Sequence, residues 1–186
     1  DEAIDMLGQV AEFKDSATGA HIRRIQEYTV RLARELAIDE ELAVAYGKAS
    51  RLHDIGKVGI PDQILRKPGR LTAEEFAIVQ QHALIGDAIL KRSPAMALAR
   101  LVARSHHEHW DGTGYPDATK GADIPLVARL VAVVDVFDAL VSTRPYKGPW
   151  QLEDAVGEIE KGRGTHFDPH VVDAFLNLHR QSKFLA

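Results

Sequence analysis

Side chains of the kinds that bind metal ions recur along this sequence of 186 residues. They are His21, His53, Asp54, His82, His106, His107 and Asp135. Taken alone, a buried His is more often a hydrogen-bonded core residue than a ligand. A lone buried Asp is as often part of a salt bridge or a helix cap as part of a site. Together, these seven side chains exceed the ligands that one ion usually takes, so we predict two metal ions.

The chemistry of these side chains limits the metals that they could bind. The sequence has no Cys, so every ligand is nitrogen or oxygen, which suits Fe, Mn, Ni, Zn or Co. Two divalent ions about 3.5–4 Å apart hydrolyse phosphate esters by holding water as hydroxide and withdrawing charge from a phosphoryl oxygen. Adjacent residues on a helix diverge by about 100°. We therefore expect His53 to bind one ion and the two oxygens of Asp54 to bridge both.

Hydrophobic periodicity places several of these side chains on buried faces. His21 lies in helical register with Ile25, and His53 lies in register with Tyr46, so both imidazoles should point inward. Asp135 interrupts a helix that is apolar nearly all round. An unpaired carboxylate there would be very costly, so it requires a partner or a bound ion.

Apolar residues at helical spacing run through most of the chain, whereas alternating strand patterns are nearly absent, so we predict one all-α domain. The expected helices are Glu2–Phe13, Ala20–Leu36, Glu40–Asp54, Thr72–Lys91, Ala95–His107, Pro125–Ser142, Leu152–Lys161 and Pro169–Arg180. Thr72 and Asp168 are residues that commonly cap helix starts. Residues 56–70 and 108–124 are rich in Gly and Pro and are expected to be surface loops. The second is long for a compact domain, which favours a functional role.

The composition argues against several other classes of protein. A formal charge of -4 leaves no broad basic face for long nucleic acid or an anionic membrane. No apolar run reaches about 18 residues and no signal segment is recognisable, so a cytoplasmic location without membrane contact is predicted. The sequence opens with Asp1 rather than Met. We therefore expect a piece of a longer protein, with a sensor or receiver domain upstream.

Three longer stretches have the residue order of a known family. They read HDIGKVGIPD from His53 to Asp62, HHEHWDGTGYP from His106 to Pro116 and DVFDALVSTRPYK from Asp135 to Lys147. Shorter stretches that agree are KPGRLT at residues 67–72, IPLVARL at 124–130 and GTHFDP at 164–169. Over most of the chain from about Thr18 onward, the sequence resembles the HD-GYP subgroup of the HD-domain hydrolases.

The resemblance implies an HD-domain helical core with additional C-terminal helices, in a catalytic domain over residues 17–186. Residues 1–16 would form a helix that continues from a lost upstream domain. The family has centres of two or three metal ions and hydrolyses cyclic di-GMP to linear pGpG or on to GMP. The sequence is compatible with a homodimer but does not decide the oligomeric state.

The resemblance also assigns roles to individual residues. The positions that correspond to metal ligands are His21, His53, Asp54, His82, His106, His107 and Asp135. Asp54 and Lys57 are assigned to catalysis, with Lys57 near the attacked phosphate, and Arg144 and Lys147 are cations that meet substrate phosphate. The alternatives are that Lys57 is an ordinary solvated lysine and that Arg144 caps the preceding helix.

Tyr115 and Asp138 have supporting roles by the same resemblance. Tyr115 either stacks on a guanine or orders its loop, and Asp138 is expected to accept a hydrogen bond from a ligand. Two positions depart from the family: Ala17 stands where many relatives have Glu, and His109 where Arg is usual. Because Ala binds no metal, we expect two ions rather than three, and chiefly pGpG as the product.

The leading hypothesis is therefore an enzyme that opens cyclic di-GMP with a metal-activated hydroxide. One alternative is a degenerate module that binds nucleotide or protein partners without turnover, and the intact set of ligand residues argues against it. Another is an HD hydrolase that acts on a different cyclic or linear dinucleotide. A comparison of substrates would separate the three.

Overall fold

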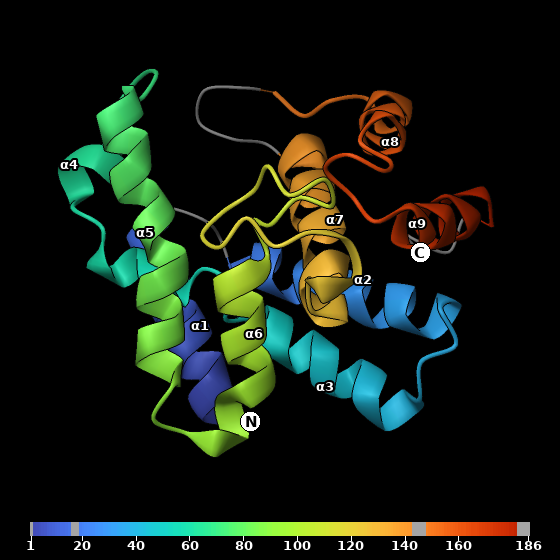
Figure 1. Ribbon diagram of the computed structural model, residues 1–186, viewed down its shortest axis with the longest axis horizontal. Helices are drawn as coiled ribbons and strands as arrows, with labels where there is room; N and C mark the ends of the chain where they lie inside the picture. The colour runs from blue at the N-terminus through green and yellow to red at the C-terminus, as the bar shows by residue number, and fades with distance from the viewer. Residues whose placement is uncertain (1, 16–18, 143–147, 182–186) are drawn as a thin grey trace.

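Helices build the fold in the computed structural model, which describes residues 2–15, 19–142 and 148–181. The α-helices are α1 (Glu2–Asp15), α2 (Gly19–Glu35), α3 (Glu40–Ser50), α4 (Asp62–Leu65), α5 (Ala73–Leu90), α6 (Ala97–Ser105), α7 (Leu126–Val141), α8 (Leu152–Lys161) and α9 (Pro169–Arg180). The 3₁₀ segments are Ile55–Gly59, Pro94–Met96 and Gly121–Asp123. The described residues contain no β-strand, and the predicted all-α class is confirmed (Figure 1).

Helix α7 lies between two hydrophobic clusters. One cluster joins it to α2, α8 and α9 and includes Phe137 and Phe175, whose ring centroids are 5.1 Å apart. The other joins it to α1, α3 and α6 and includes Val131 and Val102. Figure 1 shows α7 in the middle of the molecule, with α5 and α6 on one side and α8 and α9 on the other. Burial on both sides explains why α7 is apolar nearly all round.

Helix α3 ends earlier than its sequence pattern predicts. It stops at Ser50, so the expectation of a helix as far as Asp54 was wrong. The next segment, Ile55–Gly59, is a 3₁₀ helix that approaches α5 closely, and a Cβ on Gly56 would lie 1.8 Å from the His82 carbonyl oxygen. Glycine alone fits such an approach. The chain therefore presents its first pair of candidate ligands, His53 and Asp54, directly before it turns onto α5.

The starts of α5 and α9 agree with the sequence. Thr72 accepts the backbone N–H of Glu75, and the Glu75 carboxylate accepts the N–H of Thr72 at 2.8 Å, which completes a capping box. Asp168 accepts the backbone N–H of His170 at the start of α9. These caps satisfy donors that helix ends leave unpaired, and they fix where each helix begins. The short helix α4 was not predicted, because it lies in a segment expected to be irregular.

Buried polar groups hold the loop of residues 108–124. Glu108 is 2% exposed, and its carboxylate accepts backbone N–H groups of the loop, including that of Asp117 at 2.7 Å. Gly114 permits a tight turn, because a Cβ there would lie 2.3 Å from the backbone nitrogen of His109. Figure 1 shows this yellow loop between α5 and α7. The loop is thus fixed beside the ligand pair that precedes it.

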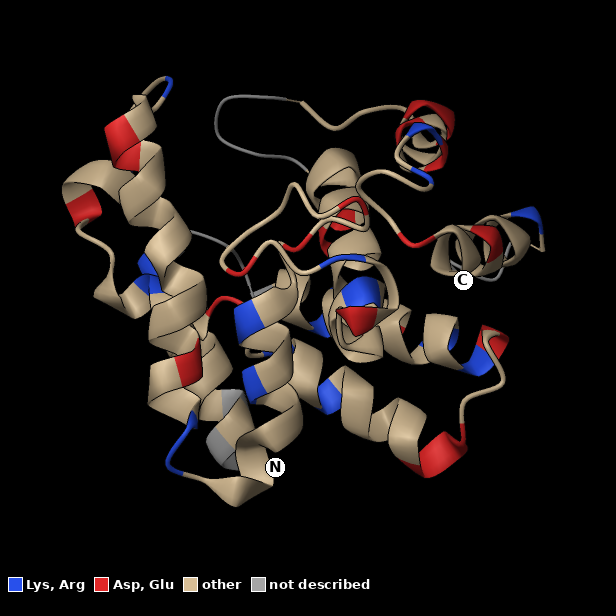
Figure 2. Ribbon diagram, in the orientation of Figure 1, with Lys and Arg blue, Asp and Glu red and all other residues tan. Residues whose placement is uncertain are grey.

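Charged residues are spread over the molecule. Figure 2 shows Lys and Arg interspersed with Asp and Glu on most helices, rather than gathered on one side. The basic residues are thus divided among several helices in this view. In the part of the chain that is described, no helix has both the length and the apolar character needed to span a bilayer.

Candidate metal centre

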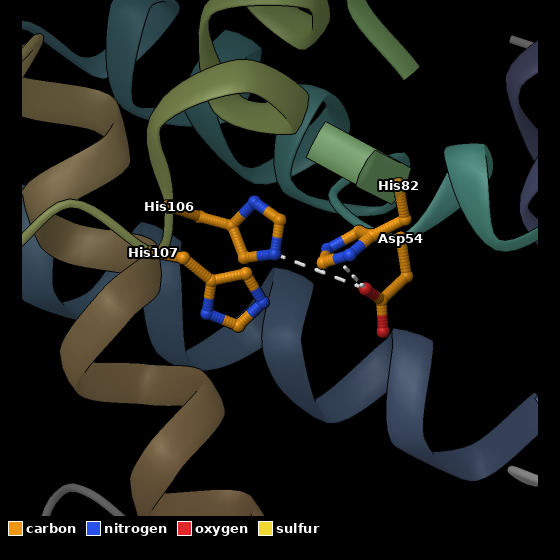
Figure 3. A group of neighbouring side chains, drawn as sticks. All are labelled: Asp54, His82, His106 and His107. Carbon is orange, nitrogen blue, oxygen red and sulfur yellow. Dashed lines mark ion pairs between the residues drawn. The ribbon is translucent and has the colours of Figure 1, made fainter. Parts of the chain in front are cut away.

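Four side chains from three separate segments form a first ligand group, made of Asp54, His82, His106 and His107. Each offers one ligand atom, and these atoms all lie within 4.8 Å of one another (Figure 3). Asp54 Oδ1 is 3.5 Å from His82 Nε2 and 3.8 Å from His106 Nε2. The two adjacent His residues follow directly after α6, which ends at Ser105 rather than at the predicted His107.

A second group consists of His21 on α2, His53 after α3 and Asp135 on α7. Asp135 Oδ1 is 3.8 Å from the Nε2 atoms of both His21 and His53. Asp54 Oδ2 is 3.3 Å from His53 Nε2, so the two oxygens of this carboxylate face different groups. The structure thus brings together all seven predicted ligands, with Asp54 between the groups.

The hydrogen bonds of three imidazoles fit a bound metal. The buried Nε2 atoms of His53, His82 and His106 have no hydrogen-bond partner among the described residues. Each Nδ1 atom instead faces a backbone carbonyl, at distances of 2.9, 2.7 and 3.0 Å respectively. A carbonyl only accepts, so Nδ1 carries the proton and Nε2 presents its lone pair to the centre. Buried polar atoms without partners are costly, and a metal ion would satisfy them.

The electrostatics of the centre favour a cation. Burial acts to lower the pKa of His53, but the nearby carboxylates of Asp54 and Asp135 outweigh it and raise this pKa to about 9. Burial lowers the pKa of His82 to about 4. Burial acts to raise the pKa of Asp54, yet Lys57 and the neighbouring imidazoles hold it well below its usual range. Without an ion, a proton on His53 would balance these carboxylates. A metal ion in its place would leave Asp54 ionised and both imidazoles neutral, the forms in which they bind metals.

Asp138 orients His21 in the second group. Its carboxylate is almost fully buried, with 1% exposed, and it faces His21 Nδ1 at 2.7 Å. Arg24 donates to both Asp138 oxygens and to Ser142 Oγ. The predicted acceptor role of Asp138 agrees with this contact, whereas sequence reasoning missed Arg24. Its position one turn after His21, on the same face of α2, is the signal that could have indicated it.

The other predicted site residues fall into two sets. Lys57 Nζ lies 2.7 Å from Asp54 Oδ2, inside the centre. The Tyr115 ring stacks on His107 with centroids 4.8 Å apart, and its backbone N–H donates to the His107 carbonyl. This geometry supports an ordering role for Tyr115 in its loop. Three further positions of the sequence argument, Ala17, Arg144 and Lys147, lie outside the described residues.

His109, the second departure from the family pattern, does not join either ligand group. Its Nδ1 lies 3.0 Å from Thr113 Oγ1, and its ring packs against His166 with centroids 4.0 Å apart. The contact joins the loop of residues 108–124 to the segment before α9, where Trp110 N–H also donates to the His166 carbonyl. His109 therefore helps to hold this loop in place.

The fold and the two ligand groups define an all-α protein with a centre of His and Asp ligands that fits divalent metal ions. A sequence profile described as HD domain matches residues 5–171 of the chain. The chain belongs to the HD domain family, and the recognition of this family from the sequence motifs is confirmed.

Curated relatives are similar along nearly the whole chain. A cyclic di-GMP phosphodiesterase of Thermotoga maritima is 46% identical over 97% of this chain and 50% of its own length. A cyclic di-GMP phosphodiesterase of Vibrio cholerae is 47% identical over 100% of this chain and 40% of its own length. The 3'3'-cGAMP-specific phosphodiesterase 2 of Vibrio cholerae is 45% identical over 94% of this chain and 34% of its own length. The chain thus spans half or less of the length of these relatives.

Solved structures share the fold at lower sequence identity. A cyclic GMP-AMP specific phosphodiesterase of V. cholerae superposes with a TM-score of 0.72 at 21% identity, over 99% of this chain and 49% of the other. The HD domain of an L. monocytogenes phosphodiesterase, solved with cyclic-di-AMP, gives a TM-score of 0.61 at 20% identity, over 95% of this chain and 96% of the other. These matches identify the helical arrangement as that of HD domains.

Proposed function

We propose that this chain is a metal-dependent phosphodiesterase domain that hydrolyses cyclic di-GMP. The observation that carries the proposal is Asp54, whose two oxygens face two groups of ligand atoms and so could bridge two divalent ions. The names of the relatives from Thermotoga maritima and Vibrio cholerae support cyclic di-GMP as the substrate. The complete set of ligand side chains argues against a binding module without turnover.

Each part of the centre has a distinct task in this proposal. Two bound divalent ions would supply an activated water and withdraw charge from the phosphodiester. Asp54 and the imidazoles hold these ions in place, while Lys57, 2.7 Å from Asp54, is close enough to the centre to meet a phosphate oxygen. Arg144 and Lys147 follow α7 in the sequence and are proposed to hold the substrate phosphates, since a planar guanidinium matches phosphate oxygens well.

The proposed product is chiefly linear pGpG. Ala17 supplies no carboxylate one helical turn before His21, which favours a centre of two ions. A third cation would help to position the extra charge of pGpG for a second cleavage. We therefore expect GMP to form slowly or not at all.

A time course with purified protein tests the function. Protein prepared without chelating resin would be loaded with Mn²⁺, incubated with cyclic di-GMP, and sampled by chromatography. We expect pGpG to accumulate and a chelator to stop its formation. No turnover with Mn, Fe, Ni, Zn or Co would overturn the proposal, and early GMP without a pGpG lag would overturn the product assignment alone.

A second substrate is favoured by one comparison. The relative that is 45% identical over 94% of this chain is named for 3'3'-cGAMP rather than cyclic di-GMP. Parallel time courses with the two cyclic dinucleotides would decide between them. We expect the larger kcat/KM with cyclic di-GMP, and the reverse order would reassign the substrate while leaving the phosphodiester chemistry in place.

A further inference from the structure

A large aromatic side chain is exposed next to the candidate metal centre. Phe76 lies in the first turn of α5 and is 47% exposed. The start of α5 is well fixed there, because Thr72 and Glu75 form a capping box and Lys67 pairs with Glu75 at 2.6 Å. An exposed ring held on a fixed helix end is available to a ligand.

Ring contacts connect Phe76 to the centre. Its ring meets Tyr115 edge-on, with centroids 6.2 Å apart and planes at 84°. Tyr115 in turn stacks on His107, a member of the first ligand group, with centroids 4.8 Å apart. Figure 1 shows the loop that carries Tyr115 beside α5. Phe76 therefore stands one ring further out from the metal centre than Tyr115.

This position suits a nucleobase. A phosphodiester held at the centre places the base of the same nucleotide one sugar away. Every base offers a flat π-face that can stack on an aromatic ring whatever its hydrogen-bonding pattern. One face of Tyr115 is already covered by His107, whereas Phe76 keeps a large part of its ring open.

We propose that Phe76 is a stacking surface for a purine base of the nucleotide bound at the metal centre. This inference rests on the proposed function, because it assumes that nucleotide phosphate binds there. Phe76 acts in binding and specificity, and it does not take part in bond breaking. It adds to the site a residue that neither the metal chemistry nor the phosphate contacts require.

Equilibrium binding of two probes tests the proposal without turnover. Guanosine monophosphate and ribose 5-phosphate differ only by the base, so the ratio of their affinities isolates the base contribution. Calorimetry with metal-loaded protein would compare the wild type with Phe76→Ala and Phe76→Trp. Ile78→Ala is the matched control, since Ile78 is a 40% exposed apolar residue on the same helix.

We expect Phe76→Ala to lower the affinity for guanosine monophosphate about tenfold, which is in the range measured for base-aromatic stacking. The affinity for ribose 5-phosphate should not change. Phe76→Trp should bind within about threefold of the wild type, because it keeps a flat ring. Ile78→Ala should change the affinity for neither probe. The proposal would be overturned if the wild type and Phe76→Ala bound guanosine monophosphate with equal affinity. It would also be overturned if Phe76→Ala lost affinity for both probes by the same factor.

The two proposals can fail separately in this design. If the wild type bound guanosine monophosphate but cleaved no cyclic dinucleotide, the proposed function would fail. The ratio of the affinities for the two probes would still decide whether Phe76 stacks on the base. If neither probe bound, the inference would be overturned together with its premise of a nucleotide at the centre. Should Phe76→Ala melt far below the wild type, Phe76→Leu and Phe76→Trp supply the same comparison of an aliphatic with an aromatic side chain.

Discussion

The two ligand groups differ in what orients their imidazoles. In the first group, His82 and His106 donate Nδ1–H to carbonyls of their own chain segments, three and four residues earlier. In the second group, His21 depends on Asp138, which lies 117 residues away on α7. Local backbone fixes the first group, whereas a contact between helices fixes part of the second. The second group should therefore be the easier one to alter without unfolding the protein.

Asp54 joins these two groups, and its removal should have the largest effect. We expect Asp54→Ala to abolish turnover and to lower metal content, because both groups lose a shared carboxylate. Helical content should be largely retained in circular dichroism. Asp62→Ala is a matched control, since Asp62 pairs with Lys14 at 2.7 Å but is 60% exposed and away from both groups. Full activity of Asp54→Ala would contradict the bridging role.

The backbone of the first group can be disturbed through Gly56. A methyl group at this position would lie 1.8 Å from the His82 carbonyl, so Gly56→Ala must push the 3₁₀ segment away from α5. We expect a loss of about 1–3 kcal/mol in the free energy of unfolding, as for other overpacked sites, together with loss of metal. Chemical denaturation and metal analysis would measure both.

Gly157→Ala provides the control for this change. An added Cβ at Gly157 has no atom within 4 Å, and the residue lies inside α8. We expect this variant to gain about 0.5–1 kcal/mol, because Ala is the better helix former. Equal stability changes in the two variants would show that the close approach at Gly56 carries no energetic weight.

Asp138→Asn tests the second group alone. It removes the ionised acceptor of His21 Nδ1 but keeps the shape of the side chain. We expect metal affinity to fall about 10–100-fold at one of two sites, the usual effect of losing an outer partner of a ligand. Metal analysis after graded dialysis against a chelator should then show one ion retained per chain. Asp87→Asn is the control, because Asp87 is a carboxylate that pairs with Arg100 and Arg104 but belongs to neither group.

The members of both ligand groups could be predicted from the sequence. His and Asp residues on apolar helix faces, together with three motifs, already indicated the seven candidate ligands. The turn that presents Asp54 could not be predicted, because the hydrophobic periodicity continues past Ser50, where α3 ends. The sequence pattern also gives no sign that Gly56 lies close to α5. Phe76 was also missed, because one aromatic residue in a helix pattern normally indicates core packing.

Arg24 was missed for a different reason, which is the distance between partners. In the sequence it resembles a solvated arginine on α2, and its partner Asp138 lies 114 residues further along the chain. Local patterns cannot pair residues so far apart. The structure is needed to show that the second ligand group depends on this contact.

Arg24→Lys should have the smallest effect and sharpens the comparison most. The guanidinium of Arg24 donates to both Asp138 oxygens and to Ser142 Oγ, whereas a lysine offers one compact charge without the planar fork. We expect metal affinity at the second group to fall by about three- to tenfold, less than the roughly 10–100-fold for Asp138→Asn, because His21 keeps its acceptor. The first group should be unchanged.

The control for Arg24→Lys is Arg163→Lys, which breaks a similar fork. Arg163 donates to both oxygens of Asp173 at 2.8 Å in an exposed pair, and neither residue belongs to a ligand group. Paramagnetic resonance of Mn²⁺-loaded protein would distinguish paired from single ions in each variant. The signal of paired Mn²⁺ ions would be followed in both variants during dialysis against increasing chelator. If it were as strong in Arg24→Lys as in Arg163→Lys, Asp138 would orient His21 without the guanidinium of Arg24. The contact between α2 and α7 at the second group would then depend on the pair of His21 and Asp138 alone.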